Sequence, residues 1–371
     1  MTWAGAGPRG AGAGHGSSIR TMNAPFAPPV PAAPSEGPGG PEALCLGETM
    51  AQVTPDLGGR LDRSSPQLLR AGGAESNVAM LLAALGHRAA WCGRLGADPL
   101  GDLVLGEVAA AGVDTTLVAR DGRRPTGVYF KAPGPKGTSV HYYRRGSAAS
   151  AMDVGLAGEL AAARPRILHL SGITPALSPG CRELVEHLVR DRPVPGALVS
   201  FDVNHRAPLW DPAAGRDPAA ELLALARASD VVFVGLDEAA GLWGVATAEE
   251  VRGLIGGPAC LVVKDGAEEA VCFDGDRVVR EPAPRVEVVE PVGAGDAFAA
   301  GWLSGLLRGL DHGRRLRLGH LVAGAVLGSV GDQAGLPGPA EIDARLDASP
   351  EAWRAGVPGP RPVITSTSRE S

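Results

Sequence analysis

The sequence predicts an α/β fold: a doubly wound, mostly parallel sheet covered by helices on both faces, with a small β lid. Three observations support this fold class. Short apolar runs rich in β-branched residues alternate with longer helical patterns. The 371 residues, 44% of them hydrophobic, are enough to build one large core. One interval, residues 126–145, contains two strand patterns with no helix between them.

The alternation of strands and helices begins at Ala43 and continues to Lys264. The predicted strands are residues 43–47, 88–92, 167–170, 197–203, 231–234 and 260–264. The predicted helices are residues 75–85, 99–111, 179–190 and 218–228. This order is typical of right-handed crossovers between parallel strands. Ligands of such sheets bind beyond the carboxyl ends of the strands, so side chains placed there are the candidates for function.

The interval without a helix is predicted to form the lid. Residues 126–131 and 138–144 both show strand alternation, and Ala-Pro-Gly-Pro-Lys-Gly joins them. Proline and glycine at such a junction indicate a hairpin standing off the main sheet. We expect the lid to combine parts of residues 51–70 and 126–145.

The two ends of the chain differ from the region between them. Residues 1–40 are rich in Gly, Ala, Pro and Ser, which predicts a disordered extension. Residues 41–340 are expected to form one domain, and residues 341–371 a C-terminal helix remnant followed by a flexible tail.

Charge and cysteine usage exclude several classes of protein. A net charge of -6 and a pI near 5.8 argue against a nucleic-acid or membrane partner, and no apolar run is long enough to span a bilayer. The five cysteines are odd in number and lie in apolar runs, which favours core residues of a cytoplasmic protein over disulfides. The eight histidines form no HExxH and no close pair, so a protein-caged zinc is not expected.

The stretch 289–301, Val-Glu-Pro-Val-Gly-Ala-Gly-Asp-Ala-Phe-Ala-Ala-Gly, is the strongest local signal for a site. We expect a strand at residues 286–289 and an amphipathic helix at residues 294–307. Glycines at a helix start, with its free amides and dipole, form an anion site suited to phosphate. The third glycine of a dinucleotide fingerprint is replaced by Phe298, and the chain has no Walker loop.

Asp296 has two interpretations in this stretch. It can cap the helix, as Asp often does. It can also serve as a general base for a hydroxyl that attacks a phosphate held by the helix start. A carboxylate beside an anion site is electrostatically unfavourable without such a task, which favours the second interpretation.

Two signatures make the chain resemble the ribokinase-like (PfkB) family of sugar kinases over residues 42–340. One is Gly-Ala-Gly-Asp at residues 293–296; the other combines Gly-Gly-Ala-Glu-Ser-Asn-Val-Ala at 72–79 with Gly-Arg-Leu-Gly-Ala-Asp-Pro-Leu-Gly at 93–101. The resemblance implies a ribokinase-like fold in which Asp296 is the catalytic base. It also implies that the amides of Gly293, Ala294 and Gly295 hold the phosphoryl group in transfer.

The substrate side of the sequence favours an acidic sugar. Tyr142 and Arg144 share one strand face, and arginine forks suit carboxylates. Within the family, the chain is most similar to kinases of 2-keto-3-deoxygluconate. That similarity implies substrate contacts by Gly73, Tyr129, Tyr142, Arg144, Asp202, Asn204, Arg206 and Asp296. The alternative is that the tyrosines are ordinary strand residues and the arginines line a solvated face, an interpretation favoured for Arg145 and Lys131 but not for Arg206.

The nucleotide side departs from the family pattern. Lys264 and Gly266 match a KxGxxG loop whose second glycine is here Glu269. Glu238 matches an acid that organises Mg²⁺ through water, but its usual Asn partner is Gly235, and Glu290 replaces the usual Asp. The implied cofactor-binding residues are Lys264, Gly266, Gly293, Gly295 and His320. For His320, which would border the adenine, a structural role is an equally good interpretation.

The expected activity is ATP-dependent, Mg²⁺-requiring phosphorylation of the terminal hydroxyl of 2-keto-3-deoxygluconate. Rival substrates are fructose, ribose and 2-keto-3-deoxygalactonate. A sugar-acid-binding regulator without catalysis is a rival of another class, since Gly235 and Glu269 depart from the pattern. A nicotinamide dehydrogenase is disfavoured by the missing third glycine. The lid is also a candidate surface for homo-oligomer formation.

Overall fold

The computed structural model describes residues 39–56, 59–134, 137–210, 215–256, 258–328 and 335–356. The disorder predicted for residues 1–40 and the flexible tail predicted at the carboxyl end therefore fall almost entirely outside the described residues.

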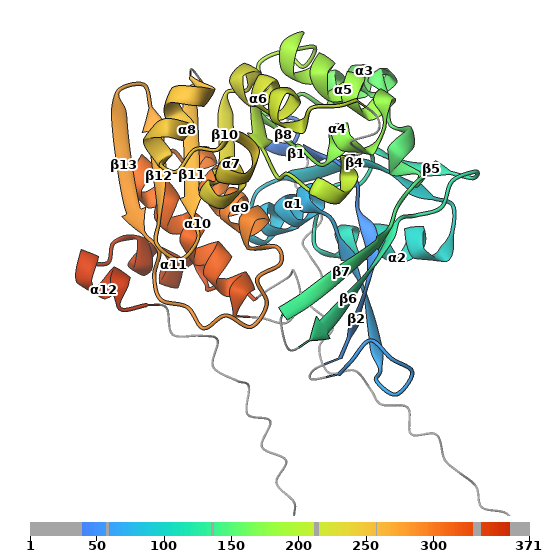
Figure 1. The fold of residues 1–371 in the computed structure, drawn as a ribbon, viewed down its shortest axis with the longest axis horizontal. Helices are drawn as coiled ribbons and strands as arrows, with labels where there is room; N and C mark the ends of the chain where they lie inside the picture. The colour runs from blue at the N-terminus through green and yellow to red at the C-terminus, as the bar shows by residue number, and fades with distance from the viewer. Residues whose placement is uncertain are drawn as a thin grey trace, which may run out of the picture. The chain divides into compact units, whose positions relative to one another are not determined.

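A large mixed sheet forms the centre of the described part of the chain (Figure 1). Its order is β13-β12-β11-β10-β9-β8-β1-β4-β5, parallel from β11 to β5, with β12 and β13 antiparallel at one edge. The strands are β1 (Ala43–Leu46), β4 (Ala89–Gly96), β5 (Val118–Asp121), β8 (Ile167–Ser171), β9 (Leu198–Asp202), β10 (Val231–Gly235), β11 (Cys260–Asp265), β12 (Glu269–Asp274) and β13 (Arg277–Pro282). The predicted fold class is thus confirmed.

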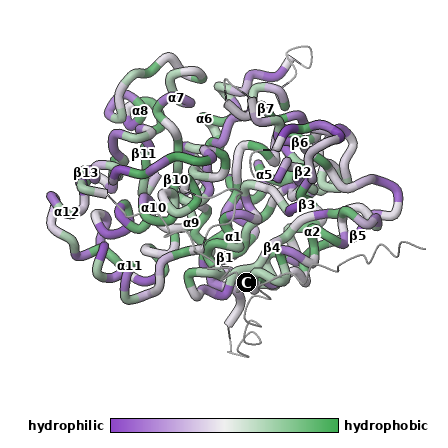
Figure 2. The backbone as a smooth tube through the Cα atoms, turned by 90° about the horizontal axis from the view of Figure 1, so that it is seen from below, coloured by the Kyte–Doolittle hydropathy of each residue, from purple (hydrophilic) through white to green (hydrophobic). Residues whose placement is uncertain are grey.

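Helices cover both faces of this sheet and enclose two separate cores. One face is covered by α1 (Ala74–Ala84), α2 (Pro99–Ala110), α9 (Ala294–Leu307), α10 (His312–Leu327), α11 (Pro339–Leu346) and α12 (Pro350–Arg354). The other is covered by α3 (Ala157–Ala163), α4 (Thr174–Leu177), α5 (Pro179–Arg190), α6 (Pro218–Ala228), α7 (Leu236–Trp243) and α8 (Ala248–Ile255). Figure 2 shows hydrophobic stretches concentrated on the central strands and on α1 and α9.

The apolar runs of the central strands follow from this two-sided burial. In β10, Val231 and Phe233 pack into one core, while Val232 and Val234 pack into the other. Successive side chains of a strand point to opposite faces, so both faces must be apolar when both are covered.

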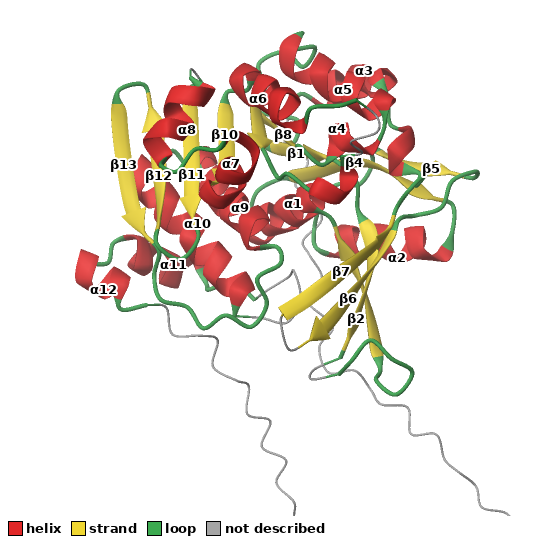
Figure 3. Cartoon of the chain, in the orientation of Figure 1, coloured by secondary structure: helices red, strands yellow, loops and turns green. Residues whose placement is uncertain are grey.

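A second, four-stranded sheet forms the lid, in the order β3-β2-β6-β7. It comprises β2 (Met50–Pro55), β3 (Gln67–Gly72), β6 (Val128–Gly134) and β7 (Gly137–Tyr143). The hairpin of β6 and β7 joins β2 in parallel, at Ala51 opposite Val128. Figure 3 shows this sheet standing off the large one.

Two local predictions around the glycine-rich stretch are wrong. Residues 286–289 are not a strand: the amide of Val289 donates to the carbonyl of Leu327 at the end of α10 (2.7 Å), and the last strand ends at Pro282. Nor is α9 amphipathic, since every residue from Asp296 to Gly305 is buried. Helix α10 crosses α9 so closely at Gly301 that a β-carbon there would lie 2.5 Å from the carbonyl oxygen of Leu318.

All five cysteines are free and buried, as their apolar surroundings predict. Among the helices of the described residues, none combines the length and the apolar character needed to cross a membrane.

Candidate active site

Asp296 lies in the first turn of α9 but does not cap the helix. The N-cap is Gly293, whose φ of 86° is a left-handed conformation that glycine adopts without strain. The buried carboxylate of Asp296 instead accepts hydrogen bonds from the Nδ2 atoms of Asn77 in α1 (3.0 Å) and Asn204 after β9 (3.4 Å). The capping interpretation is therefore wrong, and two amides from other elements orient the carboxylate.

The chain beyond β9 supplies polar groups to the same place. Asn204 has a φ of 39°, a left-handed conformation that Asn tolerates better than most residues. Asp202, at the end of β9, forms an ion pair with Lys264 of β11, with 3.1 Å between Oδ2 and Nζ. A β-carbon on Gly295 would lie 3.6 Å from that Nζ atom, so the ammonium group reaches the start of α9.

Glu238, in the first turn of α7, adds a third carboxylate to this cluster. It accepts hydrogen bonds from the amides of His205 and of Gly235, which is the N-cap of α7. Burial, assisted by the negative charge of Asp202, raises the pKa of Glu238 to about 7, while Lys264 opposes the shift. The cluster is rich in negative charge: three carboxylates, Asp202, Glu238 and Asp296, lie around one lysine.

The lid supplies a second group of the expected residues. The Tyr129 hydroxyl donates to Gln52 (2.8 Å), and the rings of Tyr129 and Tyr142 lie 5.6 Å apart. Arg144 forms a buried ion pair with Glu48, with 2.6 Å between Nε and Oε2. A side chain on Gly73 would collide with the carbonyl oxygen of Glu48. The backbone just after β1 therefore lies in close contact with the N-cap of α1.

Arg144 and Arg206, both expected to contact the substrate, have different surroundings. The side chain of Arg144 is 8% exposed and paired with Glu48, whereas Arg206 is exposed and donates to the carbonyl of His205 (3.1 Å). In this structure Arg206 is therefore the more available of the two to a ligand.

Gly266 and His320, also expected to contact the nucleotide, lie in different surroundings. Gly266 has a φ of 48° in the turn between β11 and β12, next to Lys264. His320 is buried against Phe298, with ring centroids 5.1 Å apart, and its Nε2 lies 3.2 Å from the carbonyl oxygen of Glu281. Burial lowers the pKa of His320 to about 4, although the contact with Glu281 opposes this. These contacts favour the structural interpretation of His320.

Several polar residues of the site were not singled out from the sequence. Asn77 and Glu48 are the clearest cases, and an Asn within the apolar helix 75–85 is the only local signal for the first. Lys131 was assigned to a solvated face, which is wrong: its side chain is 1% exposed and its Nζ lies 3.8 Å from Oε2 of Glu290. This contact joins the lid to the loop before α9. Arg145, assigned to the same solvated face, is indeed exposed.

Several of the buried polar atoms that have no hydrogen-bond partner among the described residues lie in or beside these groups, among them Thr49 Oγ1, Gln52 Nε2, Asn77 Oδ1 and Asp202 Oδ1. Buried polar groups are nearly always paired in folded proteins, so such atoms point to a polar ligand or water.

The sequence profile of the pfkB family carbohydrate kinases matches residues 41–339. The chain belongs to this family. A curated relative, 2-dehydro-3-deoxygluconokinase of Bacillus subtilis, is 35% identical over 309 residues, which cover 80% of this chain and 92% of the relative. The 2-dehydro-3-deoxygalactonokinase of Haloferax volcanii is 32% identical over 281 residues, 72% of this chain and 85% of that protein.

A solved structure of a PfkB protein from Polaromonas sp. JS666 resembles this pfkB kinase in fold as well. It is 34% identical, with a TM-score of 0.71, and the match covers 82% of this chain and 99% of that one. The large sheet, the lid and the cluster around Asp296 therefore belong to a carbohydrate kinase.

The residues around Asp202 suit a divalent cation, which a kinase of this family implies. Asp202 has a buried carboxylate oxygen without a hydrogen-bond partner among the described residues, and its negative charge acts on the buried carboxylate of Glu238 nearby. Mg²⁺ prefers carboxylate oxygens and retained waters, both of which this donor set can accommodate.

Proposed function

We propose that this protein phosphorylates the terminal hydroxyl of 2-keto-3-deoxygluconate with ATP. The observation that carries the proposal is the placement of Asp296: a carboxylate oriented by Asn77 and Asn204 at the glycine-rich start of α9. A base fixed beside an anion site is the arrangement that phosphoryl transfer to a hydroxyl requires.

In the proposed reaction, Asp296 takes the proton of the sugar hydroxyl as its oxygen attacks the γ-phosphorus of ATP. The bond from this phosphorus to the β–γ bridging oxygen breaks, and ADP leaves. The amides of Gly293, Ala294 and Gly295 receive the charge that develops on the transferring group. Lys264, whose Nζ reaches the start of α9, adds positive charge on the same side.

We assign the sugar to the space between the lid and the carboxyl ends of the large sheet. Gly73, Tyr129, Tyr142, Asp202 and Asn204 are the proposed partners of its hydroxyl groups, together with the unpaired atoms of Thr49 and Gln52. Arg206 is the proposed partner of its carboxylate, because its guanidinium is exposed and not committed to a buried ion pair. Arg144 is proposed to position the lid through Glu48 and to add positive potential.

ATP and Mg²⁺ are the proposed cofactors. Lys264 and Gly266 would lie along the nucleotide, whereas His320 is proposed to support the adenine side only through packing. Glu238 would hold Mg²⁺ through water, and the negative charge of Asp202 nearby would favour binding of the ion. When bound, the ion neutralises phosphate charge.

A phosphorylation panel tests the function. Purified protein with ATP and Mg²⁺ is given 2-keto-3-deoxygluconate, 2-keto-3-deoxygalactonate, gluconate, fructose or ribose, and ADP release is measured. We expect the largest kcat/KM with 2-keto-3-deoxygluconate. A preference for fructose or ribose would contradict the proposed substrate, and no turnover on any sugar would support a regulator without catalysis.

We also propose that the protein acts in the cytoplasm and that two copies associate through their lids. Strands β7 and β3 are the two edges of the lid sheet. Each carries an exposed apolar side chain: Tyr143 of β7 is 68% exposed and Leu69 of β3 is 46% exposed. Sedimentation velocity should give a dimer that Tyr143→Ser weakens. A monomer at all concentrations would contradict the association.

A further inference from the structure

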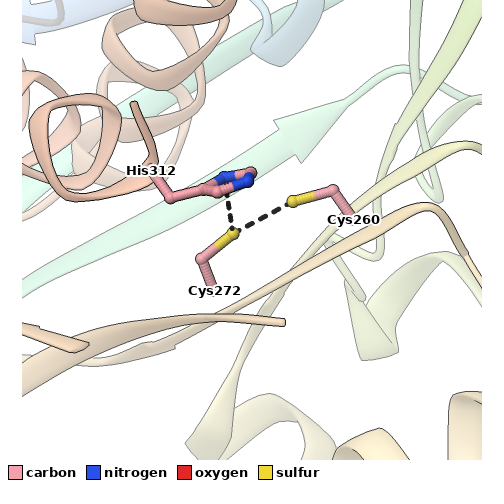
Figure 4. Close-up of side chains that lie close together, drawn as sticks. All are labelled: Cys260, Cys272 and His312. Carbon is pink, nitrogen blue, oxygen red and sulfur yellow. Dashed lines mark hydrogen bonds between the residues drawn. The ribbon is translucent and has the colours of Figure 1, made fainter. Parts of the chain in front are cut away.

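Three metal-ligating side chains meet far from the candidate active site, at the opposite end of β11 from Lys264. They are Cys260 of β11, Cys272 of β12 and His312 at the start of α10, and Figure 4 shows them pointing toward one another. The Sγ atoms of the cysteines lie 3.0 Å apart, and Sγ of Cys272 lies 3.4 Å from Nδ1 of His312. All the ligand atoms lie within 4.8 Å of one another.

The secondary structure holds these side chains together. Cys272 pairs with Val262 across the antiparallel ladder, so Cys260, two residues before Val262, faces the same side of the sheet. Asp311 caps α10 by accepting from the amide of Arg314 (3.0 Å), which places His312 in the first turn, above both sulfurs. The three residues are 6%, 1% and 8% exposed, so the site is nearly dry.

A carboxylate supports the imidazole from the other side. Nε2 of His312 lies 2.9 Å from Oδ2 of Asp274, the last residue of β12. With the proton on Nε2, this contact leaves the Nδ1 lone pair directed at the sulfurs. Metal-bound histidines almost always make such a contact with the nitrogen that is not a ligand, so Asp274 provides the support that a metal site needs.

We propose that Cys260, Cys272 and His312 bind a zinc ion. Two sulfurs and one imidazole are a donor set that zinc prefers over magnesium or calcium. With Zn–S bonds of about 2.3 Å and Zn–N bonds of about 2.1 Å at tetrahedral angles, sulfur and nitrogen are about 3.5 Å apart and two sulfurs about 3.8 Å. The distance between Sγ of Cys272 and Nδ1 of His312 already fits, and the two sulfurs need to separate by less than 1 Å, within reach of side-chain rotation. We assign the fourth coordination position of the ion to a single buried water molecule.

The ion has a structural role, because the cluster is remote from Asp296 along every element that carries it. It ties the hairpin of β11 and β12 to α10, which packs against α9. No local spacing in the sequence predicts the site, since its ligands are 12 and 40 residues apart on three elements. That separation explains why the sequence led us not to expect a protein-caged zinc.

Cobalt(II) is the probe for the site. It occupies zinc sites, and thiolate ligands give it a sulfur-to-metal charge-transfer absorption band that zinc lacks. Untagged full-length protein is reduced, freed of metal with a chelator and titrated with Co²⁺ without air. We expect one equivalent to bind with a sulfur-to-cobalt charge-transfer band that Zn²⁺ abolishes. The band should be lost in Cys272→Ser and Cys260→Ser, and retained in the control Cys181→Ser, a buried cysteine of the other core.

Two further readouts separate a bound ion from a packing defect. Asp274→Asn leaves all three ligands in place and should weaken Co²⁺ binding by about 10- to 100-fold. Zn²⁺ should raise the midpoint temperature of unfolding of the wild type but not of Cys272→Ser, because a ligand of the folded state stabilises it. Circular dichroism and kinase turnover confirm that each variant is folded. No band in the folded wild type, a band that persists in Cys272→Ser, or a disulfide between Cys260 and Cys272 that survives the reducing step would overturn the proposal.

Discussion

Arg206 and Arg145 are two exposed arginines with different proposed roles. Arg206 follows β9 near Asp202, while Arg145 follows the lid hairpin and has no proposed contact with the sugar. We expect Arg206→Ala to raise the KM for 2-keto-3-deoxygluconate by about 10- to 100-fold, because a charge-assisted hydrogen bond is worth about 1.5–3 kcal/mol. Steady-state kinetics with Arg145→Ala as the matched control measure this, and equal effects in both variants would contradict the assignment.

The sequence singled out Asp296 but not the residues that orient it or support the lid beside it. Asp296 was identified because glycines at a helix start and a family signature both mark it. Asn77 and Glu48 were missed, since a single buried Asn or Glu has no periodicity and its partner lies 219 or 96 residues away. Lys131 was misassigned because its side chain packs beside Glu290, in the loop before α9, which is distant from it in the sequence.

At the scale of elements, the ion pair between Arg144 and Glu48 anchors the end of the lid hairpin. Both side chains are buried, at 8% and 1% exposure. Arg144→Ala should lower the free energy of unfolding by about 3–5 kcal/mol, since it leaves the Glu48 carboxylate buried without its cation. Urea unfolding of Arg144→Ala and of the double variant Arg144→Ala with Glu48→Gln measures this. The double variant should recover part of the loss, and an unchanged unfolding midpoint in the single variant would contradict a buried pair.

His320 packs α10 against Phe298 of α9, and its burial makes the stability of the fold sensitive to acid. Its folded-state pKa, about 4, is below its ordinary value of 6.5, so the unfolded chain binds the proton more readily. The stability contributed by neutral His320 is therefore present above pH 6.5 and is lost as the pH falls toward 4, by up to about 3 kcal/mol.

His320→Gln removes this titration while keeping a side chain that can donate to the carbonyl of Glu281. The variant should have a lower stability at pH 7 but a shallower loss between pH 6.5 and pH 4. Urea unfolding midpoints across that range measure both slopes. Parallel curves for the wild type and the variant would show that His320 does not titrate as proposed.

Element boundaries were predictable where a strand or helix carries its own pattern. The helices at residues 179–190 and 218–228 agree with α5 and α6, because apolar spacing and N-terminal prolines mark both. The strand expected at residues 286–289 is absent because the backbone of Val289 bonds to the end of α10 instead, a non-local contact that β-branched residues do not reveal.

At the scale of the whole molecule, the order of strands and helices was enough to predict the doubly wound sheet, since crossover rules leave few alternatives. The same rules say nothing of how the lid pairs with the rest of the chain. The parallel pairing of β2 with β6 joins segments more than 70 residues apart, so only the folded chain reveals it.

The proposed sugar site, the proposed anion site and the oriented carboxylate of Asp296 lie together at the carboxyl ends of the large sheet. Asp296→Asn keeps the size of the side chain but removes its basicity, which makes it the most direct test of this account. With ATP, Mg²⁺ and 2-keto-3-deoxygluconate saturating, we expect kcat to fall by about 10²- to 10⁴-fold while the KM of the sugar changes little. Thermal unfolding confirms that the variant is folded, and near-normal turnover in that folded variant would contradict the assignment of Asp296 as the base.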